Sequence, residues 1–356
     1  MSVNVVLRDR AIRHALELNR YGAGLADRMV RLLNRADDEL LARLAALLVS
    51  IDERGLMLSR RSRDRLDKAL KEVASLNTAA YQDLGDELVK ELEEFSAAEA
   101  AFQHKAITTA LPVEVAVTLP SPARLKAIVT DAPFEGRLLS EYLAGMERGR
   151  IDRISAAVKS GLTKGKSSDD IIRAIRGTKA AGYSDGVLDI SRRSATNIVR
   201  TAVNHTSNVA AQETWKAASS VVKGWQFLAT LDTRTTTDCA SKDGDVYPIG
   251  EGPIPPRHIR CRSISVAVTK SFREMGIDRD ELPETKRASM DGQAAPGTRF
   301  EAWLKSKDEA AQEKVLGKTR AELFRAGKLN LKDFVDGEGR TITLDELKRA
   351  HGDILG

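Results

Sequence analysis

The sequence predicts a mainly α-helical protein with a small β-containing (α+β) domain. Ala and Leu are frequent, and aromatic residues make up only 4% of the 356 residues. This composition favours helices, because Ala, Leu, Arg, Lys and Glu lose little conformational freedom in a helix. Long stretches repeat apolar residues at three- and four-residue steps, whereas β-branched or alternating runs are short and few.

Residues 8 to about 107 are predicted to form long amphipathic helices with a break at Gly55 and Ser59. The first apolar face comprises Leu25, Met29, Leu32, Leu33, Leu40, Leu44, Leu47, Leu48 and Ile51. The second comprises Leu66, Leu70, Val73, Ala80, Leu84, Leu88, Leu92 and Phe95. We expect two antiparallel helices with an Ala/Leu seam, forming a helical arm over residues 1–110.

A linker is predicted over residues 111–136. Its first part, Pro112 to Thr118, alternates and is β-branched, which predicts a short strand. Pro120 and Pro122 cannot continue a helix, so a domain boundary is placed here and helices are expected to resume near Arg137.

The next predicted domain covers residues 137–270. Ser168 is predicted to cap a helix whose first turn is acidic. A loop at 177–186 precedes a long helix at about 187–218. Strands follow at 221–231 and 263–268, and the first places Trp225, Phe227 and Ala229 on one face and Gln226 and Leu228 on the other.

Residues 232–262 are rich in Asp, Gly, Pro and Thr, so they are predicted to form an irregular segment. Loops of this length are usually functional or cross-braced. The last segment, 271–356, is predicted to be an extension with short helices around Trp303, Leu316 and Phe324.

The positive charge of the chain is unevenly distributed. The formal net charge is +5, but residues 121–270 contain 23 basic and 15 acidic residues, a local excess of +8. Such a bias is what a nucleic-acid neighbour requires, although a solvated basic surface has the same composition. No apolar stretch reaches the ~20 residues of a membrane span, and the N-terminus has no secretory pattern. Two cysteines make no disulfide framework, which indicates a reducing cytoplasm.

The most informative stretch runs from residue 200 to residue 262. Its motif residues are Arg200, Asn204, Asp232, Arg234, Thr235, Cys239, Asp243, Gly244, Pro256, His258, Cys261 and Arg262. Their order and spacing resemble the phage Mu protein F-like head-morphogenesis family of minor head proteins. The resemblance covers roughly residues 137–268. Weaker similarities to a tail found in some members reach Leu347.

The resemblance implies a non-enzymatic virion component, present in few copies in the head near the portal vertex and made in the host cytoplasm. It also implies portal protein and/or major capsid protein as partners, an oligomeric state in the virion, and in some members delivery with the DNA. Non-specific contact with phage DNA is the nucleic-acid partner that the basic middle segment favours.

The motif residues also have an interpretation from their chemistry alone, as a brace for the irregular segment. Arg200 is expected to bind Asp232 or Asp238 through two hydrogen bonds. Asn204 can bond loop carbonyls and amides, and Asp232 with Arg234 and Thr235 suits an Asx-type turn.

Two enzymatic alternatives use the same stretch. A metal-dependent nuclease or other hydrolase would use Asp238, Asp243 and His258, together with Asp245. A nucleophilic pair of Cys239 and His258 would need an orienting third group and an oxyanion site, and no glycine-rich turn surrounds the cysteine.

Cys239, His258 and Cys261 are expected to brace the segment by hydrogen bonds, with no tightly bound cofactor or metal. The spacing also fits zinc, but a structural zinc usually has four Cys or His ligands. Here the fourth would be His205, Asp238 or Asp243. Many members of the family have two further cysteines, where this chain has Thr236 and Ser263. A Cys239–Cys261 disulfide is the third alternative.

Overall fold

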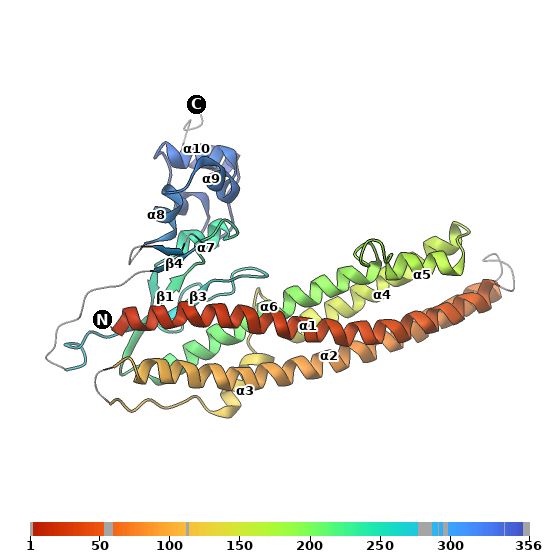
Figure 1. Ribbon diagram of the computed structural model, residues 1–356, viewed down its shortest axis with the longest axis horizontal. Helices are drawn as coiled ribbons and strands as arrows, with labels where there is room; N and C mark the ends of the chain where they lie inside the picture. The colour runs from red at the N-terminus through yellow and green to blue at the C-terminus, as the bar shows by residue number, and fades with distance from the viewer. Residues whose placement is uncertain are drawn as a thin grey trace. The chain divides into compact units, whose positions relative to one another are not determined.

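The computed structural model describes residues 3–52, 60–111, 114–276, 287–290, 292–294, 298–337 and 339–351. These parts of the chain are mainly helical, with one three-stranded and one two-stranded sheet (Figure 1). The predicted fold class is therefore confirmed. The chain divides into two compact units. Unit 1 contains Met1–Asn19, Phe95–Leu125 and Asn204–Gly356, and unit 2 contains Arg20–Glu94 and Lys126–Val203.

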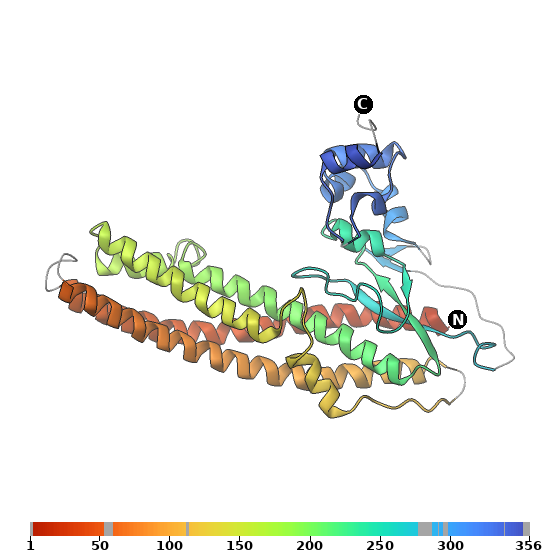
Figure 2. The ribbon, with the colours of Figure 1, turned by 180° about the vertical axis from the view of Figure 1, so that it is seen from behind.

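The predicted long N-terminal helices are α1 (Val3–Asp52) and α2 (Arg60–Thr108). Within unit 2, Arg28 pairs with Glu91, and Arg43 further along α1 pairs with Glu72 further back along α2. This order of partners shows that the helices run antiparallel, as predicted, and they lie side by side in both views (Figure 2). The predicted break at Gly55 and Ser59 lies outside the described residues.

Residues 114–120 form no strand, so the predicted strand at 112–118 is wrong over its described part. The alternation itself is real, because Val115 and Val117 pack against the core of unit 1 while their neighbours are exposed. No strand among the described residues pairs with this segment; instead, the Val117 carbonyl lies 3.0 Å from Nε2 of His104 on α2. An alternating pattern therefore shows that one face of an extended chain is buried. A β-strand and an unpaired extended segment both produce it.

Helix α3 (Pro122–Thr130) occupies part of the predicted linker, which corrects the expectation that helices resume near Arg137. A proline is tolerated in the first turn of a helix, where its missing N–H has no partner to lose. Ser121 accepts the backbone N–H of Arg124, and Leu125 and Ile128 are buried.

Helices α4 (Leu139–Thr163), α5 (Ser168–Arg176) and α6 (Val187–Ala217) follow. Ser167 caps α5 by accepting the N–H of Asp170, so the predicted cap, Ser168, is instead the first helical residue. In unit 2 these helices share an apolar core with α1 and α2. Beside it, buried Asp37 accepts hydrogen bonds from Arg150 and Arg192.

The three-stranded antiparallel sheet of unit 1 has the order β2-β1-β3. It contains β1 (Val222–Leu228), β2 (Val246–Tyr247) and β3 (Ile264–Thr269), and Trp225 pairs with both Tyr247 and Ala267. The predicted facing is confirmed, since Trp225 and Phe227 join the large core of unit 1 whereas Leu228 joins a separate cluster.

The C-terminal part of unit 1 contains a hairpin of β4 (Arg287–Ser289) and β5 (Gly292–Ala294), which was not predicted. Helices α8 (Phe300–Lys305), α9 (Glu309–Leu316) and α10 (Lys318–Arg325) confirm the predicted short helices. A 3₁₀ turn η1 (Leu331–Phe334) and helix α11 (Leu344–His351) follow. No helix among the described residues is both long and apolar enough to cross a membrane.

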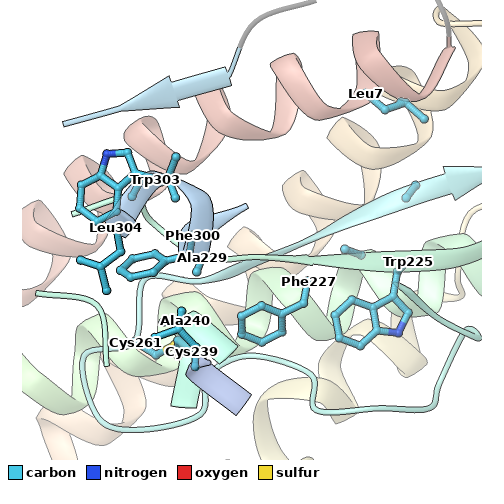
Figure 3. Close-up of a cluster of buried hydrophobic side chains, with 14 of the residues drawn as sticks. Leu7, Trp225, Phe227, Ala229, Cys239, Ala240, Cys261, Phe300, Trp303 and Leu304 are labelled. Atoms are coloured by element: carbon cyan, nitrogen blue, oxygen red, sulfur yellow. The ribbon is translucent and has the colours of Figure 1, made fainter. Parts of the chain in front are cut away.

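The compact units cut across the predicted linear segments 1–110, 111–136, 137–270 and 271–356, because α1, α2 and α6 each supply residues to both units. The core of unit 1 combines residues from both ends of the chain. Figure 3 shows Phe227 of β1, Ala240 from the 232–262 segment and Phe300 and Trp303 of α8 in this one cluster.

Candidate functional site

The 232–262 segment is held at its two ends by one ion pair. Asp232, just after β1, accepts hydrogen bonds from Nη1 and Nη2 of Arg262 at 2.5 and 2.8 Å. It also accepts the N–H of Arg234 at 2.9 Å, which is the predicted Asx-type turn. Thr235 closes the turn by donating to the Thr230 carbonyl at 2.5 Å.

Burial raises the pKa of the Asp232 carboxyl, but its hydrogen bonds with Arg262 and Arg234 outweigh burial and lower that pKa to about 2. The same contact with Asp232 raises the pKa of Arg262. Both groups are therefore charged at neutral pH, and the two-point contact fixes the direction of both side chains.

The two-point contact with Asp232 that was expected of Arg200 is made by Arg262. The bidentate partner of Asp232 is Arg262, whereas Asp238 is paired with Lys242 and lies 3.5 Å from Nε of Arg257. Arg200 belongs to unit 2. Two arginines in one motif offer the same guanidinium chemistry, so the sequence alone does not choose between them.

Two asparagines one turn apart on α6 connect this helix to the start of β3. Asn204 donates to the Ser263 carbonyl at 3.1 Å, so its predicted bonding to loop carbonyls is confirmed. Asn208 accepts the Ser265 N–H at 2.7 Å and donates to Asn204 Oδ1 at 3.1 Å. Asn208 was missed by the sequence reasoning, although its position four residues after Asn204 places both on one helix face.

The middle of the segment is a short helix rather than an irregular loop. Helix α7 (Thr237–Lys242) is capped by Thr236, whose side chain accepts the N–H of Cys239. Asp238 lies in its first turn and Lys242 in its last, where each charge complements the helix dipole. These signals were present in the sequence, but the abundance of Asp, Gly and Thr concealed them.

Asp243 ends α7 and joins three parts of unit 1. One carboxylate oxygen accepts the Ala229 N–H at 2.8 Å and the other accepts the Phe300 N–H at 2.7 Å. The residue is only 4% exposed. Gly244 follows with a φ of +83°, a conformation that favours glycine, and donates its N–H to the Phe227 carbonyl. The contact with Phe300 ties the C-terminal extension to this site and was not predicted.

The second half of the segment brings His258 and Cys261 next to α7. The Pro255–Pro256 peptide bond is cis, and both prolines are buried. The Cys261 N–H donates to the His258 carbonyl at 3.0 Å, which closes a turn before β3. His258 is half-buried, and its Nδ1 lies 3.0 Å from the Ile259 carbonyl oxygen.

Cys239 and Cys261 are free thiols, both buried, and their sulfurs lie 3.7 Å apart (Figure 3). Their hydrogen bond lowers the pKa of Cys261, and His258 lowers that pKa further. The same hydrogen bond, followed by burial, raises the pKa of Cys239. These opposite shifts favour the thiolate on Cys261 over the thiolate on Cys239.

Two aspartates of the hydrolase alternative, Asp238 and Asp243, have partners within the protein. Both oxygens of Asp243 accept backbone N–H groups, and Asp238 is paired with basic side chains, so neither carboxylate points to an open metal position. A catalytic metal needs ligand oxygens directed at it and one position open to substrate. The geometry instead supports a braced segment with a compact Cys–His–Cys cluster.

The site therefore lies in a mainly helical protein with a small sheet, on a segment that is held by its own ion pairs and hydrogen bonds. Residues 152–266 match the family model described as "Phage Mu protein F like protein". This match confirms the resemblance predicted from the motif over this segment, which is about a third of the chain. No curated protein and no solved structure matches the chain.

Proposed function

We propose that the chain is a minor head protein that acts in head morphogenesis near the portal vertex of a phage. The observation that carries this proposal is the family match over residues 152–266. The matched segment of this phage family includes the second half of α4, all of α6 and the whole 232–262 segment. A phage head-related protein is the coarser statement that the family supports. A location near the portal vertex and a role in head assembly are the more specific parts of the proposal.

A structural rather than catalytic role agrees with the contacts of the site. The most buried acidic residue of the segment, Asp243, accepts hydrogen bonds from the backbone N–H groups of Ala229 and Phe300. The ion pair of Asp232 and Arg262 likewise closes the segment onto itself. Side chains committed in this way stabilise a rigid surface, which is what a protein that docks on other head proteins needs.

The proposed partners are portal protein and/or major capsid protein, with phage DNA as a non-specific contact and several copies of the chain in each virion. The excess of +8 in residues 121–270 supports the DNA contact. Binding of this kind releases counterions, so it should weaken steeply between ~50 and ~200 mM salt. Fluorescence anisotropy with labelled duplex DNA measures it, and binding that salt leaves unchanged would contradict it.

Deletion and complementation test the proposed role in assembly. Removing the gene should lower the yield of DNA-filled heads, and the wild-type chain supplied from a plasmid should restore it. Asp243→Asn should restore less, because an amide nitrogen cannot accept one of the two backbone N–H groups. The exposed Asp152→Asn on α4 is the matched control and should restore the yield fully.

Electron microscopy of lysates, together with infectious titre, gives the readout for these strains. A deletion strain that produces filled, infectious particles at the wild-type yield would refute the morphogenesis role.

A further inference from the structure

Three side chains with metal-binding atoms converge in unit 1 from two separate stretches of chain. Cys239 comes from α7, and His258 and Cys261 come from the turn before β3. One ligand atom from each residue lies within 4.8 Å of the other two. Both sulfurs are buried and the histidine is half-buried, so the group is reachable from solvent on the histidine side.

The distance between the sulfurs excludes one of the three alternatives left open by the sequence, the disulfide, and is compatible with zinc. Zinc–sulfur bonds of about 2.3 Å at a tetrahedral angle place two thiolates about 3.8 Å apart. The observed separation is 3.7 Å. A disulfide needs about 2.05 Å, so the pair is unbonded. A thiol–thiol hydrogen bond is compatible with the distance, but it is weak and gives no reason for an imidazole to join the group.

The charge of the group also suits a buried divalent ion. Two thiolates neutralise one Zn²⁺, and the third ligand, imidazole, is neutral, so the complex carries no net charge. A neutral complex is compatible with Cys239 at 1% and Cys261 at 4% exposure inside the main core of unit 1. Sulfur and imidazole ligands together select zinc over magnesium or calcium, which prefer oxygen ligands.

We propose that Cys239, His258 and Cys261 bind one zinc ion that fastens α7 to the turn before β3. The protein supplies three ligands, and water from the half-buried side of His258 takes the fourth position, unlike the four protein ligands usual for structural zinc. The sequence led us to expect no tightly bound metal, because Thr236 and Ser263 stand where many family members have cysteines. This proposal revises that expectation. The convergence of the three remaining ligands is visible only in the fold.

Zinc content of the full chain, purified in the presence of a phosphine reductant and dialysed, tests this proposal. We expect about one equivalent by elemental analysis. Cobalt exchanged into the site should give a thiolate-to-metal band in the near ultraviolet and strong visible bands of a tetrahedral centre. The chain has two cysteines in all, so a thiolate band reports on this cluster alone.

Cys239→Ser, Cys261→Ser and His258→Ala should each lower zinc occupancy at least ~10-fold. His104→Ala is the matched control, because it removes a histidine that contacts Val117 instead and should keep the metal. The cobalt spectrum of the wild-type chain needs no variant, so it stays decisive if a variant fails to fold. Reduced wild-type chain without zinc and without a cobalt–thiolate band would overturn the proposal, and so would a Cys239–Cys261 disulfide as the sole product.

Discussion

The negative charge of Asp232 stabilises the fold, and its contribution can be measured through the pH dependence of the free energy of unfolding. Its folded pKa of about 2 is below the ordinary value of 3.8, because contacts with Arg262 and Arg234 outweigh burial. Stability from this group is therefore present above pH ~4 and is lost as the pH falls towards 2. We expect Asp232→Asn to lower the free energy of unfolding by about 1–2 kcal/mol at pH 7.

Urea denaturation of the wild type and Asp232→Asn between pH 7 and pH 3 measures this effect. The difference between the two chains should shrink as the pH falls towards 3, because Asp232 takes up its proton near pH 3.8 in the unfolded chain but stays ionised in the folded one. Asp152→Asn, an exposed position on α4, is the control and should differ little from the wild type at any pH. A loss of stability in Asp232→Asn that is constant down to pH 3 would show that its charge is not the cause.

The residue-level predictions from sequence succeeded where the partner was local. The turn at Asp232 depends on a backbone N–H two residues away, so a short pattern contains the required information. The pairing of Asp232 with Arg262 crosses 30 positions, and the contact of Asp243 with Phe300 crosses 57. Such contacts depend on how strands and helices pack, which composition and spacing do not specify.

The packing of α4 against α5 gives a test at the scale of elements. A Cβ at Gly161 would lie 2.5 Å from Cγ1 and 2.9 Å from Cδ1 of Ile171 on α5. At Gly145 on the same helix, a Cβ would meet nothing within 4 Å. Alanine is favoured over glycine in a helix by about 1 kcal/mol, so Gly145→Ala should be stabilising.

Gly161→Ala should instead lower the free energy of unfolding by about 1–3 kcal/mol, because overpacking at Ile171 outweighs the gain in helix propensity. Chemical denaturation of the two variants beside the wild type gives the comparison. A Gly161→Ala chain as stable as Gly145→Ala would mean that α5 does not pack on this face of α4.

Elements with a clear apolar repeat were predictable, because the repeat itself is visible in the sequence. The helix expected at 187–218 is α6, Val187–Ala217, and the strand expected at 263–268 is β3, Ile264–Thr269. Two short helices inside the predicted linker and the predicted irregular segment were not. α3 and α7 depend on single caps, Ser121 and Thr236, and on burial against a core that the sequence does not reveal. Residues 114–118 alternate without pairing as a strand.

At the scale of the whole molecule, the compact units could not be read from linear boundaries. Unit 1 gathers residues from the start, middle and end of the chain, including Leu7, Trp225 and Phe300 in one core. The family segment, 152–266, supplies residues to both units. A domain boundary predicted from prolines and composition marks a change of local structure, whereas a compact unit is defined by long-range packing.

The central claim, that the chain is a component of phage heads, is tested most directly by counting its copies in purified particles. Heads made from the genome that encodes the chain are separated on a density gradient, and targeted mass spectrometry measures the chain relative to major capsid protein. We expect it to sediment with heads at a small fraction of the capsid copy number. Loss of the chain from particles that have released their DNA would indicate ejection with the genome. A chain found only at the top of the gradient, absent from mature heads and assembly intermediates, would contradict the account.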